Sequence, residues 1–149
     1  MGLFRLTTMR VWRISEFLSV AGEGGKLSIG RWHNVGRPIL YTAESPAVTL
    51  LEALVRFDDE DDLAAGYQLL EIEVPKAAMA EWQRALPKRQ ESRAWGDDWL
   101  AGGKTGIAKV PSAVAPHSFN YLINPLHPDV ASVRLVEAQR WDWDERLAH

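Results

Sequence analysis

A chain of 149 residues, of which 46% are hydrophobic and 25% charged, suits one domain with one core, and this composition excludes disorder over the whole length. The formal net charge of −3 supplies no positive field that would attract phosphate backbones, so we expect no direct nucleic-acid binding by this chain. The absence of cysteine excludes disulfides and thiolate metal sites and is compatible with the reducing cytoplasm.

The first part of the chain is expected to form two short strands joined by loops. Residues 1–8 are interpreted as an extension that could be flexible, at the start of a single domain that spans residues 1–149. The N-terminus lacks the hydrophobic block of a signal peptide, and no apolar run is long enough to cross a bilayer, so we predict a cytoplasmic protein outside the membrane. The expected elements are a strand over Arg10–Ile14, a glycine-rich loop over residues 21–25 and a strand over Ile39–Thr42.

A helix is predicted to begin at Ser45-Pro46 and to end near Phe57. Ser45 can cap free backbone amides, and Pro46 suits the first helical position because no amide hydrogen is needed there. The first apolar stripe consists of Val48, Leu51 and Val55, and the second consists of Leu50, Leu54 and Phe57. The outward face consists of Thr49, Ala53 and Arg56. Glu52 lies at the edge of the first stripe and is therefore expected to be half-buried. The acidic residues 58–62 end the helix in solvent.

The second half of the chain mixes strands with short helices. The expected strands are Tyr67–Val74, Ile107–Val110, Phe119–Ile123 and Ser132–Ala138. The expected helices are Lys76–Trp82, Gln90–Leu100 with Gly102-Gly103 at its end, and Trp141–Leu147. Because long helices do not regularly separate the strands, the order favours an α+β fold with a mixed or mostly antiparallel sheet over a doubly wound fold. The seven tryptophans are expected mainly in the core.

Several common catalytic and ligand-binding motifs are absent. The histidines lack the spacing of metal ligands, so we predict no metal site and interpret them as surface or turn residues, namely His33, His117, His127 and His149. The chain has no GxxxxGK(S/T) or GxGxxG nucleotide loop and no GxSxG nucleophile motif. Mononucleotide kinases, Rossmann dehydrogenases and serine hydrolases are therefore disfavoured.

The remaining candidates for chemistry are an arginine, a tyrosine and a glutamate. Arg31 could hold a pyrophosphate with two parallel hydrogen bonds, and Tyr41 could stack on a flat ring. A partly buried carboxylate at Glu52 could bind a ribose hydroxyl and stabilise positive charge at the anomeric carbon. Together these groups suit cleavage of a glycosidic bond in a dinucleotide. Each has a plainer alternative: a surface salt bridge for Arg31, a core ring for Tyr41 and a helix-surface acid for Glu52.

From about Met9 to about Trp141 the chain resembles the RES domain family, which is named for an arginine, a glutamate and a serine. The matching pieces are Gly30-Arg31-Trp32-His33-Asn34, LYTAESPA at residues 40–47, Leu51-Glu52-Ala53-Leu54, Val110-Pro111-Ser112, and FNYLINP at residues 119–125 with His127-Pro128. The resemblance implies a bacterial toxin with a fold similar to ADP-ribosyltransferases that depletes cellular NAD. It also implies a partner, an Xre-type helix-turn-helix antitoxin, which covers the active site and represses the operon.

The same resemblance implies catalytic roles for four residues and a binding role for a fifth. Arg31 would bind the NAD phosphates, with help from Arg13 on the first strand. Tyr41 would pack on the nicotinamide ring, while Glu52 holds the ribose and steadies the oxocarbenium-like transition state. Ser112 would bond a ribose or phosphate oxygen or position the nucleophile.

Three polar residues near the end of the chain have open roles. Ser112 has a local alternative, a bond to its own backbone after the preceding proline. Asn124 is expected in a turn before Pro125. Asn120 could point into the cleft, but we leave both asparagines out of the catalytic set.

Three functions remain to be compared. The leading one is an enzyme that depletes NAD by hydrolysis or phosphorolysis of the nicotinamide–ribose bond, with NAD as substrate and no prosthetic group. Nicotinamide leaves NAD as a neutral molecule, so one carboxylate can suffice where ordinary glycosidases use two. The first alternative is an ADP-ribosyltransferase that modifies a macromolecule, and the second is a non-catalytic module that docks a partner in an apolar groove. A homodimer is left open in each case.

Overall fold

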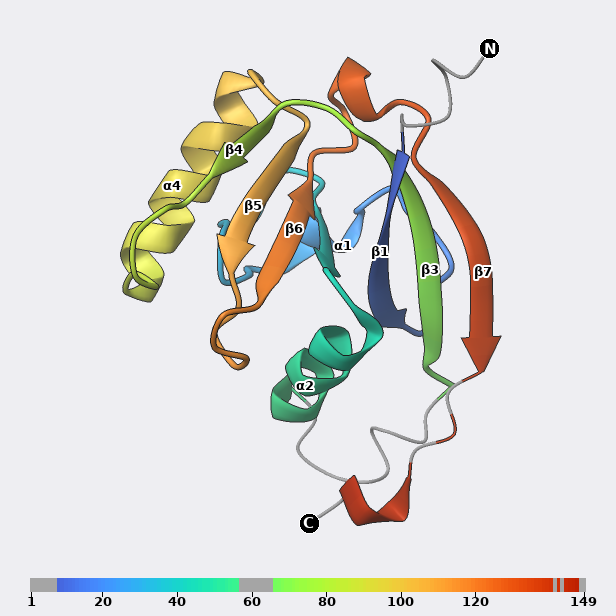
Figure 1. Cartoon of the computed structure of the whole chain (residues 1–149). Coiled ribbons are helices and arrows are strands. Elements are labelled where there is room, and N and C mark those ends of the chain that lie inside the picture. The colour runs from blue at the N-terminus through green and yellow to red at the C-terminus, as the bar shows by residue number, and fades with distance from the viewer. Residues whose placement is uncertain (1–7, 57–65, 141, 143, 148–149) are drawn as a thin grey trace.

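The computed structural model describes residues 8–56, 66–140, 142 and 144–147 (Figure 1). Its strands are β1 (Thr8–Ser15), β2 (Leu40–Ala43), β3 (Gln68–Pro75), β4 (Met79–Glu81), β5 (Ile107–Pro111), β6 (Phe119–Ile123) and β7 (Arg134–Arg140). Its helical elements are α1 (Gly24–Leu27), α2 (Pro46–Arg56), α4 (Arg89–Gly102) and the short turns η2 (Pro128–Val130) and η3 (Glu145–Leu147). Among the residues described, no helix is both long and apolar enough to span a bilayer.

The seven-stranded sheet is weakly joined between β1 and β2. The strand order is β4-β5-β6-β2-β1-β3-β7, with β4 and β5 parallel and the other neighbours antiparallel. β1 pairs with β3 along its whole length but with β2 only at Trp12 and Ala43. Figure 1 shows the resulting two halves, with α4 beside β4 and β5 and with α2 at one end of the sheet. At this end, Asn120 lies opposite Ala43 on one side and Val110 on the other.

Most predicted strands and helices are confirmed, with ends shifted by one or two residues. The helix predicted over Lys76–Trp82 is wrong, because Met79–Glu81 forms β4 and pairs in parallel with β5. The partner strand lies beyond α4, so a local pattern cannot indicate this pairing. The loop predicted at residues 21–25 contains the start of α1, and the terminal helix is reduced to η3. Residues 1–7, 58–62 and Trp141, on which other predictions fall, lie outside the described residues.

Helix α2 begins as predicted but buries a different face. The amide of Val48 donates to the hydroxyl of Ser45 at 3.2 Å, which is the expected cap. The buried residues are Val48, Thr49 and Ala53, whereas Leu51 and Val55, predicted on the core side, are 43% and 66% exposed. The helix packs on Ala43 and Ala115, and such small residues allow a close approach that hydrophobicity alone does not predict. Glu52 is half-buried, as predicted.

The tryptophans pack α4 against the loop that carries Arg31, which confirms the core interpretation for this part of the chain. Trp32 and Trp82 are buried, and these two rings and that of Trp95 pack edge to face with centroids 5.6–5.8 Å apart. A side chain at Gly96 would collide with the carbonyl oxygen of Trp32. Glycine at this position therefore allows α4 to lie directly on the loop.

Candidate active site

The centre of the site is the carboxylate of Glu52, which α2 carries to the end of β5 and the start of β6. The hydroxyl of Ser112 donates to Glu52 Oε1 at 2.6 Å, and Nδ2 of Asn120 donates to the same oxygen at 2.9 Å. The residues come from α2, from the turn after β5 and from β6, so three segments far apart in sequence meet at one oxygen. The structure therefore brings together the predicted Glu52 and Ser112.

Ser112 makes the expected local bonds as well as the long-range one. It is 8% exposed, and its oxygen accepts from the amides of Val114 at 3.2 Å and Ala115 at 3.0 Å. Its hydroxyl hydrogen is directed to Glu52. The backbone alternative considered from sequence and the contact with Glu52 are thus both present in one side chain.

Asn120 belongs to this cluster, although the sequence analysis left it out. Because a carboxylate oxygen accepts only, Nδ2 must face Glu52, and Oδ1 is then turned away from it. This Oδ1 is buried and has no hydrogen-bond partner among the described residues. A buried acceptor without a donor is unusual and costs free energy in the folded state. The signal in the sequence was a polar residue within the apolar strand Phe119–Ile123.

Arg13 and Tyr41 meet at the weak junction between β1 and β2. Nη1 of Arg13 donates to the backbone oxygen of Tyr41 at 3.0 Å. Burial, followed by the like charge of Arg56, lowers the pKa of Arg13 to about 10, whereas Tyr41 raises it. Arg13 therefore keeps its positive charge at neutral pH. No carboxylate of the described residues forms an ion pair with it.

The hydroxyl of Tyr41 is held inside a hydrogen-bond network. It accepts from the amide of Trp32 at 3.0 Å and lies 2.7 Å from Nδ1 of His33, whose Nε2 lies 3.0 Å from the carbonyl oxygen of Gly25. Since a carbonyl only accepts, Nε2 carries the hydrogen, and in a neutral ring Tyr41 donates to Nδ1. Burial raises the pKa of Tyr41, so its hydroxyl stays protonated. A side chain at Gly30 would collide with this hydroxyl.

The position of His33 corrects one prediction. The sequence analysis interpreted it as a surface or turn residue, but it is only 2% exposed and bridges Tyr41 to the α1 turn. The physical reason is the bend at Gly30–His33, where the two residues form an isolated bridge and turn the ring inward. The alternative interpretation of Tyr41 as a core ring is confirmed in part, because its ring is partly buried against the cluster that contains Trp32 and Trp82.

Arg31 lies on the loop that packs against α4. It forms no ion pair with a carboxylate of the described residues. Its Nη2 donates to the carbonyl oxygen of Pro87 at 2.7 Å, and its Nε is buried without a partner. Burial and the like charges of Arg89 and Arg93 lower the pKa of Arg31, while the charge of Glu52 raises it. The charge of Glu52 thus acts on Arg31, although no hydrogen bond joins them.

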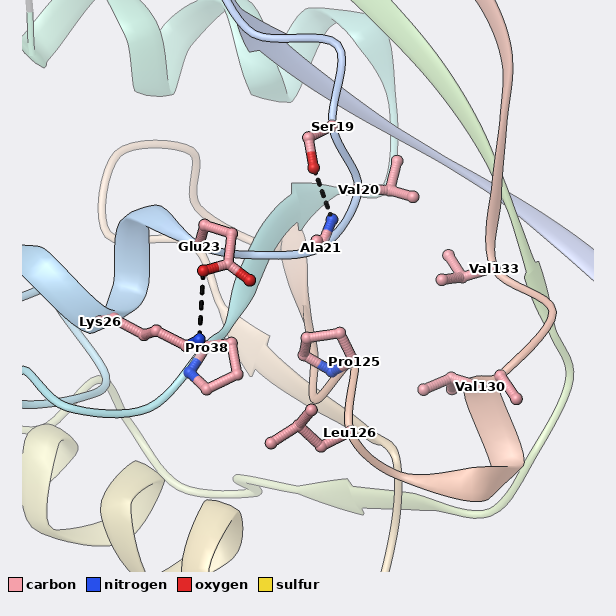
Figure 2. Close-up of a pocket in the computed structure, with 11 residues that line it drawn as sticks. Ser19, Val20, Ala21, Glu23, Lys26, Pro38, Pro125, Leu126, Val130 and Val133 are labelled. Carbon is pink, nitrogen blue, oxygen red and sulfur yellow. Dashed lines mark hydrogen bonds and ion pairs between the residues drawn. The ribbon is translucent and has the colours of Figure 1, made fainter.

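A pocket lies at the other end of the sheet from Glu52 (Figure 2). It encloses about 330 Å³ and is lined by residues of the 19–26 segment, Pro38 and the loop around η2. Glu23 and Lys26 form an ion pair of 3.2 Å at its wall. None of the five predicted site residues lines this pocket. We therefore define the candidate active site by the contacts of Glu52, Tyr41 and Arg31.

The fold and these contacts define an α+β protein that holds one carboxylate at the end of a divided sheet. The expected α+β fold with a mixed, mostly antiparallel sheet is confirmed. Residues 10–144 match the family model described as RES domain. The chain belongs to the RES domain family, which confirms the resemblance that Arg31, Glu52 and Ser112 indicated.

Comparison with curated proteins identifies toxins among the relatives. The chain is 36% identical over 148 residues to "Toxin Res" of Pseudomonas putida, an alignment that covers 93% of this chain and 99% of that protein. It is 32% identical over 157 residues to the "Prs ADP-ribosylating toxin" of a Sphingobium strain, covering 94% and 97%. Among solved structures, the M. tuberculosis MbcT-MbcA toxin-antitoxin complex contains a chain with the same fold, at a TM-score of 0.72 and 18% identity, covering 90% and 84%.

Proposed function

We propose that this chain is the toxin of a toxin–antitoxin pair and depletes NAD by cleaving the bond between nicotinamide and ribose. The observation that supports this most directly is the asymmetric bonding of Glu52. Ser112 and Asn120 both donate to Oε1, and no described residue donates to Oε2. A carboxylate fixed through one oxygen can offer the other to a ribose hydroxyl and to positive charge on the sugar.

In the proposed reaction, the glycosidic electron pair moves to the nicotinamide nitrogen as the bond breaks. The ring loses its positive charge and leaves as neutral nicotinamide, so no general acid is required. The negative charge of Glu52 stabilises the oxocarbenium-like ribose that remains. Water then adds at the anomeric carbon and releases a proton, which gives ADP-ribose. Inorganic phosphate in place of water would give ADP-ribose 1″-phosphate.

The other predicted residues bind and orient the substrate in this scheme. Arg31 and Arg13 hold the pyrophosphate through guanidinium groups that form no ion pair with a carboxylate of the described residues. The ring of Tyr41 packs on nicotinamide, while its hydroxyl is retained by His33. Ser112 acts as a positioning residue, because its hydroxyl hydrogen is directed to Glu52.

An Xre-type helix-turn-helix antitoxin is the proposed partner. The supporting observations are the names of the relatives, which are toxins, and the toxin–antitoxin complex that contains a chain of the same fold. Expression of this chain alone should arrest bacterial growth and lower cellular NAD. Co-expression of a helix-turn-helix protein encoded by the neighbouring gene should restore growth and yield a complex that purifies intact.

Transfer of ADP-ribose to a macromolecule is the second candidate function. It is favoured by the Sphingobium relative, whose printed name describes an ADP-ribosylating toxin. Both reactions use the same bond cleavage and differ in what attacks the anomeric carbon. Labelled NAD mixed with the protein and cell lysate separates them, because only transfer leaves the label on a macromolecule.

The direct test is nicotinamide release from NAD by the purified chain. Glu52→Gln keeps the size of the side chain and removes its charge, so we expect release to fall at least 100-fold with the melting temperature unchanged. The matched control is Glu137→Gln on the exposed face of β7, which should keep the wild-type rate. Wild-type activity in Glu52→Gln, or release by neither Glu52→Gln nor the wild type, would overturn the proposal.

A further inference from the structure

Three arginines surround the start of α4. Arg89 and Arg93 belong to its first two turns, and the guanidinium of Arg31 reaches the same place through its bond to the carbonyl oxygen of Pro87, at 2.7 Å. The hydroxyl of Ser92 contacts the backbone oxygens of both Arg31 and Arg89, at 2.7 Å and 3.0 Å, and so joins the loop to the first turn of the helix. Arg93 donates through Nε to the carbonyl oxygen of Gly30 at 2.9 Å, which leaves both of its terminal nitrogens without a partner among the described residues.

No ion pair among the described residues neutralises this cluster. Five other arginines each lie within ion-pair distance of a carboxylate, namely Arg10, Arg84, Arg134, Arg140 and Arg146. Within the described part of the chain, no carboxylate lies within ion-pair distance of Arg31, Arg89 or Arg93. A group of like charges without counter-ions from neighbouring side chains attracts anions from solution.

Two further features make the same place attractive to an anion. Nε of Arg31 is buried and has no acceptor in the part of the chain that the structure describes, so one strong donor is left for a ligand. The residue before α4, Lys88, gives no side-chain cap to the helix, and its first-turn acid, Glu91, is turned to Arg84 at 3.9 Å. The positive end of a helix of 14 residues therefore adds to the field of the arginines.

The cluster lies on the same side of the molecule as Glu52. Figure 1 shows that α4 begins at the end of the sheet where α2 lies. Arg31 lies against the start of α4, because its Nη2 donates to the carbonyl oxygen of Pro87 and its own carbonyl oxygen accepts from the hydroxyl of Ser92 at 2.7 Å. A ligand that places a sugar at Glu52 can therefore extend past Arg31 to Arg89.

We infer that Arg89 and Arg93 complete, with Arg31, a subsite for the diphosphate of an adenosine nucleotide. The identity of this occupant rests on the proposed function, because the diphosphate of NAD is the anion that would accompany a ribose at Glu52. Planar guanidinium groups match phosphate oxygens with paired hydrogen bonds, and a diphosphate supplies two negative charges to a group of three cations. The subsite also binds the product half of the substrate, so ADP-ribose and ADP compete with NAD.

The test is direct binding of ADP, AMP and adenosine to the full chain, measured by calorimetry and by tryptophan fluorescence. Trp32 directly follows Arg31, and Trp95 lies two residues after Arg93, so their fluorescence reports binding at the arginines. We expect ADP to bind more tightly than AMP, and adenosine to bind weakest. Arg89→Gln should weaken ADP binding about tenfold, the effect of one charge-assisted hydrogen bond at an exposed position.

The control is Arg140→Gln, which removes the same charge from β7 at the opposite edge of the sheet and should leave ADP binding unchanged. Arg89→Lys should fall between the wild type and Arg89→Gln, because it keeps the charge and loses the paired geometry. In nicotinamide release, Arg89→Gln should raise KM about tenfold and leave kcat within about twofold.

Failure of the subsite and failure of the proposed function give different results. Equal ADP affinity in Arg89→Gln and Arg140→Gln, no ADP binding by the wild type, or adenosine bound as tightly as ADP would each overturn the subsite, whatever the catalytic rate. ADP binding that depends on Arg89 without any NAD consumption would support the subsite and reject the proposed function.

Discussion

Asn120→Ala tests whether the amide next to Glu52 serves catalysis or the fold. The substitution removes Nδ2, one of two donors to Glu52 Oε1, and leaves the bond from Ser112 in place. It also removes Oδ1, the buried acceptor without a partner among the described residues. Loss of the Nδ2 bond lowers the stability of the fold, and loss of the unsatisfied Oδ1 raises it. Only the loss of Nδ2 changes the contacts of the Glu52 carboxylate.

The magnitudes separate the two roles. A hydrogen bond to a charged group contributes about 1.5–3 kcal/mol, so loss of the Nδ2 bond in the transition state lowers kcat about 10- to 100-fold. Burial of an unsatisfied polar atom costs about 1–3 kcal/mol, and its removal offsets most of the lost bond in the folded state. The melting temperature should therefore change by no more than about 5 °C.

The assay is nicotinamide release as a function of NAD concentration, with a thermal melt of the same samples. We expect kcat to fall and KM to stay within about threefold, because the amide positions Glu52 rather than the phosphates. The control is Asn124→Ala in the same segment, which removes an acceptor of the Leu126 amide, at 3.2 Å, and should lower stability without changing kcat. Full activity in Asn120→Ala, or a melting temperature more than about 10 °C lower, would refute the reasoning.

Other substitutions test the remaining contacts. Ser112→Ala should lower both kcat and stability, because it removes a donor to Glu52 and the acceptor of two backbone amides; an unchanged melting temperature would contradict this. Tyr41→Phe should lower the free energy of unfolding by about 2 kcal/mol or more, since it leaves His33 and a backbone amide unpaired, but should keep kcat at 20 °C within about threefold because the ring is retained. Burial lowers the pKa of Arg13 from its ordinary value to about 10, so its charged form destabilises the fold at every pH below about 10. This cost disappears as the pH rises above the folded-state pKa. Arg13→Gln should therefore melt at an equal or higher temperature at pH 7 while its KM for NAD rises, and NAD binding by the wild type should show no titration of Arg13 between pH 6 and about 9.

The sequence predicted those elements whose signals are local. The alternation in β3 and the Ser45-Pro46 start of α2 depend on neighbouring residues, and both are confirmed. β4 could not be predicted in this way, because its three residues are a strand only where β5 pairs with them. The buried face of α2 was missed for a related reason: contact with the alanines of β2 and the 112–118 turn outweighs the apolar character of Leu51 and Val55.

The site was predicted only as far as the family resemblance extended. Glu52 and Ser112 are 60 positions apart, and no periodicity indicates that they share a hydrogen bond. Asn120 was recognised as ambiguous because a polar residue in a central strand has two meanings, and only the register with Ala43 places it beside α2. His33 was misassigned since histidine spacing indicates metal ligation but carries no information on burial.

The junction between β1 and β2 explains how the fold maintains a charged site. Beyond the single pair of Trp12 and Ala43, the two strands do not continue their ladder, and the carbonyl oxygen of Tyr41 accepts from the guanidinium of Arg13. The guanidinium thus satisfies the carbonyl oxygen of Tyr41. The same hydrogen bond fixes a positive charge at the sheet junction, beside the strand that leads into α2. A glutamine there could satisfy the carbonyl without the cost of a desolvated charge. Under the proposed function, the charge of Arg13 serves NAD binding rather than the fold. Stability and ligand binding therefore favour different residues at this position, and comparing Arg13→Gln with Arg13→Lys measures that conflict directly.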